Sequence, residues 1–166
     1  MKRFVPLVLM ALLAVSCGIY SFTGTSIQAD VNTITIPYVE YKALRVNPSL
    51  ANDISEELRT RFRRMTSLEQ VEMDGDLEII GEISGYDVQA SAVTADEVAA
   101  QNRLTVVVKV DFNNVKHPED SFTGKSFSAY ADYDSTNSLD AVESALCAEI
   151  IEKIIEDIFN ATVAQW

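Results

Sequence analysis

The chain has 166 residues, of which 25 are acidic and 13 basic, so its formal net charge is −12. This excess of carboxylates argues against a nucleic-acid-binding protein, because phosphates demand basic patches. It also argues against flat binding to an anionic membrane surface. Without a leader of sixteen residues, the remaining length is that of one ordinary domain.

The first sixteen residues have the pattern of a bacterial secretion signal. A positive Met-Lys-Arg head precedes an almost wholly apolar stretch over residues 4–15, and small residues lead to Cys17. The stretch is too short to span a bilayer, which needs about 20 apolar residues. A core helix of a cytoplasmic protein is the alternative, but it does not explain the charged head together with the small-residue exit. We therefore predict a lipoprotein signal peptide over residues 1–16.

Cys17 is predicted to carry a lipid anchor. The stretch from Ala14 to Cys17 resembles a lipobox, in which the cysteine becomes the mature N-terminus and its sulfur takes a thioether-linked lipid. Ala14 stands where leucine is commoner, although Leu12 and Leu13 lie just upstream. One acyl chain binds membranes only marginally, so stable anchoring needs the several chains of a triacylated cysteine. Gly18 follows Cys17, at the position where an aspartate retains many lipoproteins in the inner membrane. We therefore predict that the protein is anchored on the periplasmic side of the outer membrane.

A polar linker and the first two elements of a folded domain come next. Residues 17–30 are polar with scattered aromatics and two glycines, and we predict a lipidated linker there. The folded domain spans residues 31–166 and opens with a short strand over 31–36, which a proline ends. A helix over residues 47–65 begins with an Asn-Pro pair, a good N-cap and first helical residue. Its apolar residues recur at helical spacing, and arginines crowd its last turns.

Three strands are predicted after this helix. Residues 76–93 alternate in two opposite phases on either side of Gly81 and Gly85, which indicates a bulge or a sharp bend. Residues 104–112 alternate cleanly between apolar and mixed positions, as in a half-buried antiparallel strand. After a turn, the last strand spans residues 121–133, with Phe, Ala, Ala and Tyr on one face.

A long amphipathic helix closes the chain, with Asn137 and Asp140 as its predicted cap and first-turn acid. The order is therefore βαβββα, with a parallel crossover at the first step and hairpins between the other strands. We predict an α+β fold, a two-layer sandwich in which two helices cover one face of a four-stranded mixed sheet. The other face carries residues such as Lys109 and Asp111 and is free to meet a partner.

The sequence indicates no catalytic residues, no cofactor and no metal site. His117 is the single histidine, and a catalytic or metal role would need partners that the sequence does not offer nearby. Cys147 lies among apolar residues of the last helix, where a packed thiol is the better interpretation. If Cys17 is acylated, Cys147 has no partner for an intramolecular disulfide. Phosphate loops, zinc spacings and nucleophile elbows are missing from the sequence, so we expect no enzymatic activity.

Four stretches of the sequence are similar to one family of envelope proteins. They are CGIYSFTG after the leader, NRLTVVVKVDF in the middle, FSAYADYD in the last strand, and IIEDIFNATVAQW at the end. In this order they resemble the Bacteroidetes branch of the LptE-like lipopolysaccharide-assembly lipoproteins. The resemblance covers nearly the whole chain after the leader. It implies two helices on a four-stranded sheet, in agreement with the predicted fold, and makes residues 31–166 an LptE-like α/β domain.

The resemblance implies a plug protein and not an enzyme. Proteins of this family fill the lumen of the LptD β-barrel translocon of the outer membrane, help that barrel to assemble, and bind lipopolysaccharide at the last step of its export. A polar plug suits the polar interior of a wide barrel, and an acidic body can complement basic lumen residues. The implied partners are an LptD-type barrel, lipopolysaccharide and, through the N-terminal lipid, the outer membrane.

Lipopolysaccharide carries phosphates, so an acidic chain must meet it with local cations. The candidates, chosen by charge and placement alone, are Lys109, Lys125, Arg103, Arg61, Arg63 and Arg64. Ordinary solvated surface charge is the competing interpretation for each of them.

Three other functions stay open at this point. One is a lipid-anchored periplasmic adaptor or pilot protein of another envelope secretion or transport complex. Another is a periplasmic lipid carrier, which needs an apolar cavity between helices and sheet. The third is a hydrolase, for which the sequence offers no nucleophile–base pair.

Overall fold

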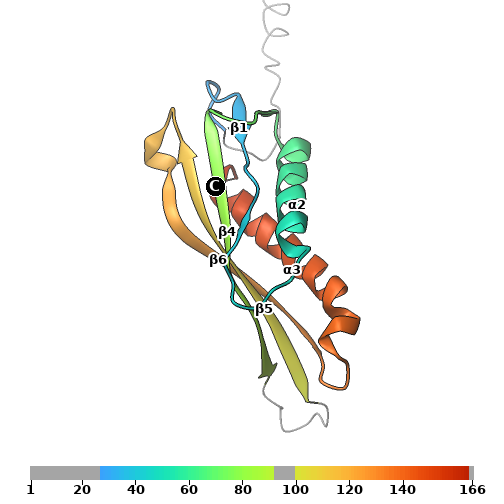
Figure 1. Ribbon diagram of the computed structural model, residues 1–166. Coiled ribbons are helices and arrows are strands. Elements are labelled where there is room, and N and C mark those ends of the chain that lie inside the picture. The colour runs from blue at the N-terminus through green and yellow to red at the C-terminus, as the bar shows by residue number, and fades with distance from the viewer. Residues whose placement is uncertain (1–26, 92–99, 165–166) are drawn as a thin grey trace, which may run out of the picture.

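The structure, a computed structural model, describes residues 27–91 and 100–164. The predicted signal peptide, Cys17 and most of the predicted linker lie outside these described residues. In chain order the elements are β1 (Thr33–Thr35), β2 (Glu40–Tyr41), α2 (Leu50–Met65), β3 (Glu69–Gln70), β4 (Leu77–Ser91), β5 (Gln101–Asn114), the 3-10 helix η2 (Pro118–Asp120), β6 (Phe122–Asp134) and α3 (Leu139–Thr162). Helices α2 and α3 form one layer and the sheet forms the other (Figure 1), so the predicted α+β sandwich is confirmed.

The sheet is mixed, with three long antiparallel strands on one side and short parallel strands on the other. The strands follow the order β3-β1-β4-β5-β6, and β2 also pairs with β4. Strands β1 and β2 run parallel to β4, which confirms the predicted parallel crossover, while β4, β5 and β6 form antiparallel hairpins. The predicted count of four strands was too low because β2 and β3 have two residues each, too few to show any alternation.

The core lies between the helices and one face of the sheet. The alternation predicted for residues 104–112 is confirmed, since Leu104, Val106, Val108, Val110 and Phe112 are all 2% exposed or less. Both helices bury an apolar stripe against this face. The ring of Phe62 in α2 meets the ring of Phe159 in α3 edge to face, with 5.2 Å between centroids. Among the described residues, no helix is long and apolar enough to cross a membrane.

The predicted bulge in the first long strand is confirmed at Gly85. The register between β4 and β5 shifts between Ile83 and Gly85, whereas Gly81 lies within the regular part of the ladder. A side chain at Gly85 would bring its Cβ to 3.0 Å from Val107 Cγ2. The bulge moves Tyr86 onto the core side, which explains why the two halves of this strand alternate in opposite phases.

Both predicted helix starts differ from the structure. The N-cap of α2 is Ser49 and the helix begins at Leu50, so the prediction of Asn47 as N-cap and of the proline as first helical residue lay two residues too early. Asn47 Oδ1 still accepts hydrogen bonds from the backbone N–H groups of Ser49 (3.1 Å) and Leu50 (3.2 Å) at the start of the helix. The predicted cap at Asn137 is wrong. Ser138 is the N-cap of α3. Asn137 belongs to the turn that leaves β6, where its backbone N–H bonds to the carbonyl of Asp134.

Candidate functional site

The end of α2 carries a cluster of arginines, of which two face α3. Arg61 and Arg64 line a groove between the helices. The guanidinium carbon of Arg61 lies 6.0 Å from the centre of the Phe159 ring, and Nε of Arg61 is buried with no hydrogen-bond partner within residues 27–91 and 100–164. Arg63 points elsewhere, since its Nη2 donates to Gln70 Oε1 at 3.4 Å. Cations at this position also suit the negative end of the helix dipole.

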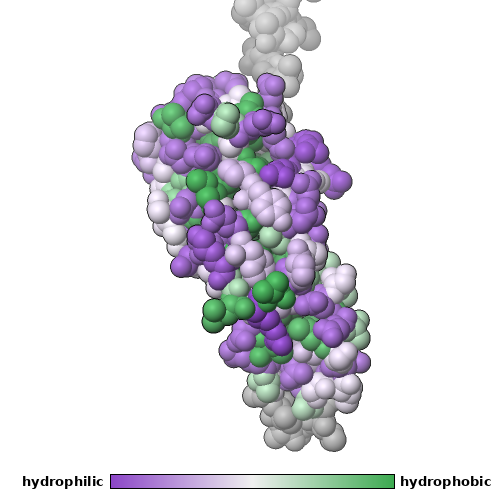
Figure 2. Space-filling model, viewed as in Figure 1, coloured by the Kyte–Doolittle hydropathy of each residue, from purple (hydrophilic) through white to green (hydrophobic). Residues whose placement is uncertain are grey.

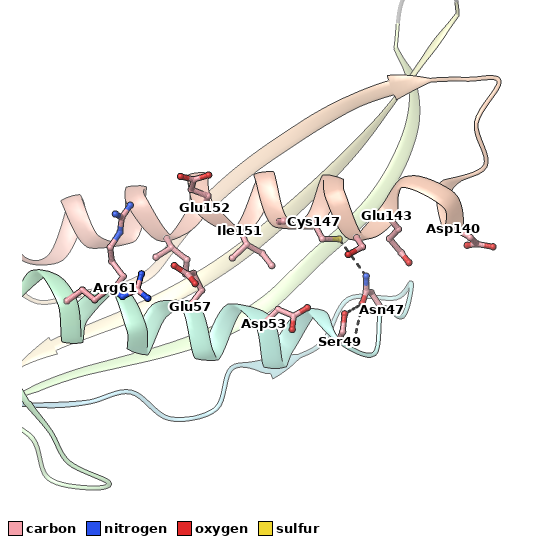
Figure 3. A pocket seen from close by; sticks show the side chains of 14 residues that line it. Asn47, Ser49, Asp53, Glu57, Arg61, Asp140, Glu143, Cys147, Ile151 and Glu152 are labelled. Atoms are coloured by element: carbon pink, nitrogen blue, oxygen red, sulfur yellow. Dashed lines mark hydrogen bonds between the residues drawn. The ribbon is translucent and has the colours of Figure 1, made fainter.

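The groove between α2 and α3 has a volume of about 690 Å³. Figure 3 shows Arg61 at one end of it, and Asn47 and Asp140 at the other. Its floor is apolar and is made by Cys147, Ile151 and Ile155. Its rim is rich in carboxylates, namely Asp53, Glu57, Asp140, Glu143 and Glu152. The groove therefore combines an apolar floor with an acidic rim, and it becomes basic at the Arg61 end.

A buried polar cluster supports the acidic end of this groove. The Tyr86 hydroxyl donates a hydrogen bond to Glu143, and Asn47 Nδ2 lies 3.7 Å from Cys147 Sγ. Burial, together with the Glu143 hydrogen bond, raises the pKa of Tyr86 well above its usual range. Burial also raises the pKa of the Cys147 thiol, and the side chain is 5% exposed. Cys147 is thus a packed thiol, as predicted.

Arg103 lies on the open face of the sheet, where its charge is already matched. Its Nε and Nη2 donate to the two carboxylate oxygens of Asp132 at 2.7 and 2.9 Å. Its guanidinium carbon lies 3.6 Å from the centre of the Tyr130 ring. These hydrogen bonds lower the pKa of Asp132 and raise the pKa of Arg103. Any phosphate that approaches Arg103 must compete with this bidentate carboxylate.

Lys109 and Lys125 do not form one site, because they lie on opposite faces of the sheet. Lys109 stands opposite Ser126 on the open face. Lys125 stands opposite the buried Val110, on the helix side, and its Nζ lies 5.0 Å from the centre of the Phe122 ring. Lys125 also belongs to β6, which is an edge strand of the sheet. The structure therefore brings Arg61 and Arg64 together and separates the other candidates.

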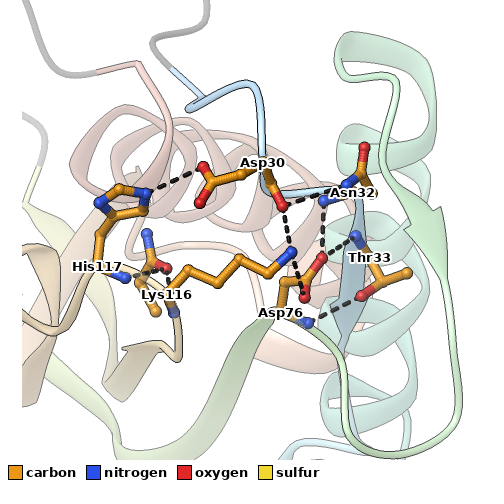
Figure 4. A network of polar contacts seen from close by, with 7 residues as sticks. Asp30, Asn32, Thr33, Asp76, Lys116 and His117 are labelled. Atoms are coloured by element: carbon orange, nitrogen blue, oxygen red, sulfur yellow. Dashed lines mark hydrogen bonds and ion pairs between the residues drawn. The ribbon is translucent and has the colours of Figure 1, made fainter.

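The sequence did not predict a polar network that joins the start of β1, the residue before β4 and the turn after β5 (Figure 4). The Asp76 carboxylate accepts backbone N–H bonds from Asn32 (2.8 Å) and Thr33 (3.1 Å) and pairs with Lys116 Nζ at 3.0 Å. These contacts lower the pKa of Asp76 to about 2, and the hydrogen bond from the Asn32 backbone N–H has the largest effect. His117 has a partner after all, since its Nε2 lies 3.0 Å from Asp30 Oδ1. The network joins segments more than 40 residues apart, so no local pattern could indicate it.

Comparison with known proteins identifies the family. A family model described as lipopolysaccharide-assembly, LptE, matches residues 31–162. The chain belongs to the LptE family. LptE proteins are lipoproteins of lipopolysaccharide assembly at the outer membrane, so this chain takes part in that process. The Bacteroidetes branch within the family stays a prediction. None of the curated proteins compared with this chain matches the chain.

Solved structures are similar to this LptE chain at low sequence identity. The hypothetical protein CT253 from Chlamydia trachomatis has a TM-score of 0.53 at 10% identity, covering 80% of this chain and 98% of its own. A minor lipoprotein from Acinetobacter baumannii has a TM-score of 0.48 at 12% identity, covering 77% and 89%. Rare lipoprotein B from Shewanella oneidensis has a TM-score of 0.45 at 13% identity, covering 78% and 90%. The likeness to CT253 concerns the fold alone.

Proposed function

We propose that this chain is an outer-membrane lipoprotein that plugs an LptD-type β-barrel translocon, helps the barrel to assemble, and binds lipopolysaccharide during its insertion into the outer membrane. The match of the LptE family model to residues 31–162 carries the proposal, because it spans both helices and every strand of the sheet. The role is structural and does not include catalysis. Among the described residues, no three His, Cys, Asp or Glu side chains are grouped to hold a metal ion.

The open face of the sheet supports a plug role. Its central positions carry exposed polar or charged side chains, such as Lys109 and Asp111 on β5 and Ser126 and Ser128 on β6. A face of this kind suits the hydrated, polar interior of a wide barrel. The acidic net charge of −12 complements basic residues in such a lumen and steers docking. The α2–α3 groove offers little support to a lipid carrier, since carboxylates rim it.

The anchor is assigned to Cys17 under this proposal. Acylation of Cys17 places the folded domain on the periplasmic side of the outer membrane, within reach of a barrel in the same membrane. Radiolabelled palmitate fed to cells is expected to label the intact protein and not a Cys17→Ala variant. A Cys147→Ala variant is the matched control, because the buried Cys147 thiol is not a lipidation site and its loss leaves the label in place. Absence of label on the intact protein would remove the anchor.

Lipopolysaccharide contact is assigned first to Arg61 and Arg64, with Arg63 beside them. These arginines share the last turns of α2, and guanidinium groups bind phosphate through paired N–H donors. Lys109 and Lys125 are separate secondary candidates on the two faces of the sheet. Arg103 ranks below them because Asp132 already occupies its donors.

The decisive experiment is co-purification from solubilised membranes. A tag placed after Trp166 is used to isolate the full chain in mild detergent, and the proteins that accompany it are identified. A large outer-membrane barrel in stoichiometric amount is the expected result. Recovery of the chain alone, or with a secretin or transporter, would overturn the plug role and favour an adaptor or pilot of another envelope complex.

A further inference from the structure

One edge of the sheet is a long strand whose outer side has no neighbouring strand among the described residues. Strand β6 pairs with β5 on its inner side and ends the strand order. Along an antiparallel ladder, the backbone groups of successive residues point alternately toward the partner strand and away from it. The ammonium of Lys153 in α3 lies 3.5 Å from the Tyr130 carbonyl oxygen, so this carbonyl points away from β5. Residues of the same parity therefore also direct their backbone N–H and C=O groups outward, namely Ser126, Ser128 and Asp132.

This outer side of β6, here called the β6 edge, carries few of the features that keep sheet edges from pairing. Natural proteins blunt an edge with a very short strand, a proline or a covering element, because a long open edge is a template for another strand. Strand β6 has 13 residues and no proline. Lys153 reaches only the Tyr130 carbonyl. The backbone groups of Ser126, Ser128 and Asp132 form no hydrogen bond within the part of the chain that the structure describes. The β6 edge is therefore open to a further strand.

A shallow groove beside the β6 edge is acidic. It has a volume of about 360 Å³, and α3 contributes Lys153, Glu156 and Asp157 to its lining. Glu156 and Asp157 are exposed and form no ion pair with any described residue, whereas Lys153 is already paired with Glu149 at 2.7 Å. A strand added beside β6 directs every second side chain to the helix side of the sheet. Carboxylates at that place favour cationic side chains.

We infer that the β6 edge binds an extended, basic segment of a partner protein, which adds one strand to the sheet. The outward backbone groups of Ser126, Ser128 and Asp132 supply the hydrogen bonds, as in other cases of strand addition. Glu156 and Asp157 select lysine or arginine at alternate positions of the segment. The main chain thus provides affinity, and the acidic groove provides specificity.

A second copy of this chain suits the β6 edge less well than a basic segment. Pairing of two β6 edges would bring the Glu156 and Asp157 carboxylates of two copies toward one another, and like charges across an interface oppose association. An apolar partner is also disfavoured. On the coloured surface that Figure 2 shows, hydrophilic side chains predominate and hydrophobic ones stand in separate small groups. The chemistry of the β6 edge is that of backbone hydrogen bonds and carboxylates.

Strand addition goes beyond the proposed plug role and fails separately from it. Strand addition is measured on the isolated chain with a synthetic peptide, whereas the plug role is measured by recovery of a barrel. A chain that binds the peptide at the β6 edge but recovers no barrel would overturn the plug role alone. A chain that recovers a barrel but leaves the β6 edge free would overturn strand addition alone.

Amide hydrogen exchange, followed by NMR on the full chain in mild detergent, tests the pairing directly. The probe is a peptide of about ten residues in which lysine and threonine alternate, long enough to form one strand. In the free chain, the outward N–H groups of Ser126, Ser128 and Asp132 are expected to exchange rapidly, and that of Ala129, which pairs with β5, slowly. Saturating peptide is expected to slow the outward groups about tenfold or more and to leave Ala129 unchanged. Outward groups that exchange equally fast with and without peptide would overturn the inference.

Two further peptides separate backbone pairing from charge. The first has the same sequence but carries an N-methyl group on every backbone amide, so it keeps the positive charge and lacks backbone donors. The second has glutamate in place of lysine. Each is expected to bind about tenfold more weakly or worse, as measured by fluorescence anisotropy of labelled peptide, because each lacks one of the two kinds of contact. If the N-methylated peptide binds as well as the unmodified one, strand addition is wrong.

Variants of the chain locate the site. Ser128→Pro removes one outward N–H at a position where an edge strand tolerates proline, and it is expected to weaken peptide binding about tenfold. Ser128→Thr keeps the N–H and is the matched control. Glu156→Lys with Asp157→Lys is expected to weaken binding by a similar factor. Its control is Glu72→Lys with Asp74→Lys, an equal change of charge in the connection between β3 and β4, at the other edge of the sheet.

Circular dichroism checks that each variant is folded, and the N-methylated peptide tests the pairing without any change to the chain. Equal weakening by the two lysine double variants would show a general attraction of a cationic peptide to an acidic protein, and would overturn the assignment to the β6 edge. Dimerisation of the chain that protects the outward amides without peptide would identify a second copy as the occupant, and would overturn the basic segment.

Discussion

His117 and Asp30 join the first described residues of the chain to the turn between β5 and β6, with 3.0 Å between Nε2 and Oδ1 and a separation of 87 positions in sequence. The hydrogen bond to Asp30 is the main cause that raises the pKa of His117 above its ordinary 6.5. The pair therefore stabilises the fold fully below pH 6.5, and this contribution is lost as pH rises through the higher folded pKa.

Because His117 is the only histidine, its proton NMR titration can be followed without ambiguity. We expect a pKa above 6.5 in the wild type and a fall towards 6.5 in Asp30→Asn. Asp74→Asn is the control, since Asp74 lies at the same end of the body without contacting His117. Titration of His117 at its ordinary value in the wild type would show that the pair does not form in solution.

Asp76 is expected to make the protein sensitive to acid. Its pKa is about 2 in the folded state against 3.8 ordinarily, so its carboxylate stabilises the fold above pH 3.8 and this contribution is lost as pH falls through about 2. Asp76→Asn is expected to melt at a lower temperature than wild type at pH 7. The difference between the two melting temperatures is expected to narrow between pH 3.8 and 2, where the wild-type carboxyl becomes protonated. A difference in melting temperature that is independent of pH would contradict this account.

The alternation of the sequence also predicts on which face of the sheet each candidate lysine lies. Lys125 has the same parity as the buried Phe127, and Lys109 has the parity opposite to that of Val108, so the pattern alone places the two lysines on opposite faces. The bulge at Gly85 was predictable for the same reason. The network around Asp76 was not, because its partners become neighbours only through the parallel pairing of β1 with β4.

The ring pair between Phe62 and Phe159 is expected to carry much of the contact between the helices. Phe62 is completely buried, so Phe62→Ala is expected to lower the free energy of unfolding by about 3–5 kcal/mol. A double-mutant cycle with Phe159→Ala, measured by urea unfolding, is expected to give a coupling of about 0.5–1.5 kcal/mol for the edge-to-face contact. Strictly additive losses would mean that the rings do not interact.

Gly75 is expected to tolerate no side chain. A Cβ at this position would lie 2.7 Å from Thr35 N and 2.9 Å from both Ile34 C and Leu77 O, all of them backbone atoms that cannot rotate away. Gly75→Ala is expected to lower the free energy of unfolding by about 1–3 kcal/mol, through the shift that it forces between β1 and β4. Gly81→Ala is the control and should cost less, because its Cβ meets only the Val39 side chain. Equal losses of unfolding free energy in Gly75→Ala and Gly81→Ala would contradict this explanation.

The arginines at the end of α2 are expected to contribute more to lipopolysaccharide binding than either lysine. Arg61 and Arg64 lie on one groove and present two guanidinium groups to one phosphate region, whereas Lys109 and Lys125 each act alone on different faces. Paired neutralisation, Arg61→Gln with Arg64→Gln, is expected to weaken binding of purified lipopolysaccharide about tenfold or more, measured on the folded full chain by surface plasmon resonance.

The single lysine changes, Lys109→Gln and Lys125→Gln, are expected to weaken lipopolysaccharide binding only a few-fold each, because each removes one charge from a different face. Lys153→Gln serves as the control, since Lys153 is already paired with Glu149 at 2.7 Å and is not one of the candidate contacts. Raised salt should reduce the wild-type affinity more than that of the double arginine variant, because exposed charges are screened. If the arginine variant binds like wild type while a lysine variant loses binding, the phosphate contact belongs on the sheet and not on α2.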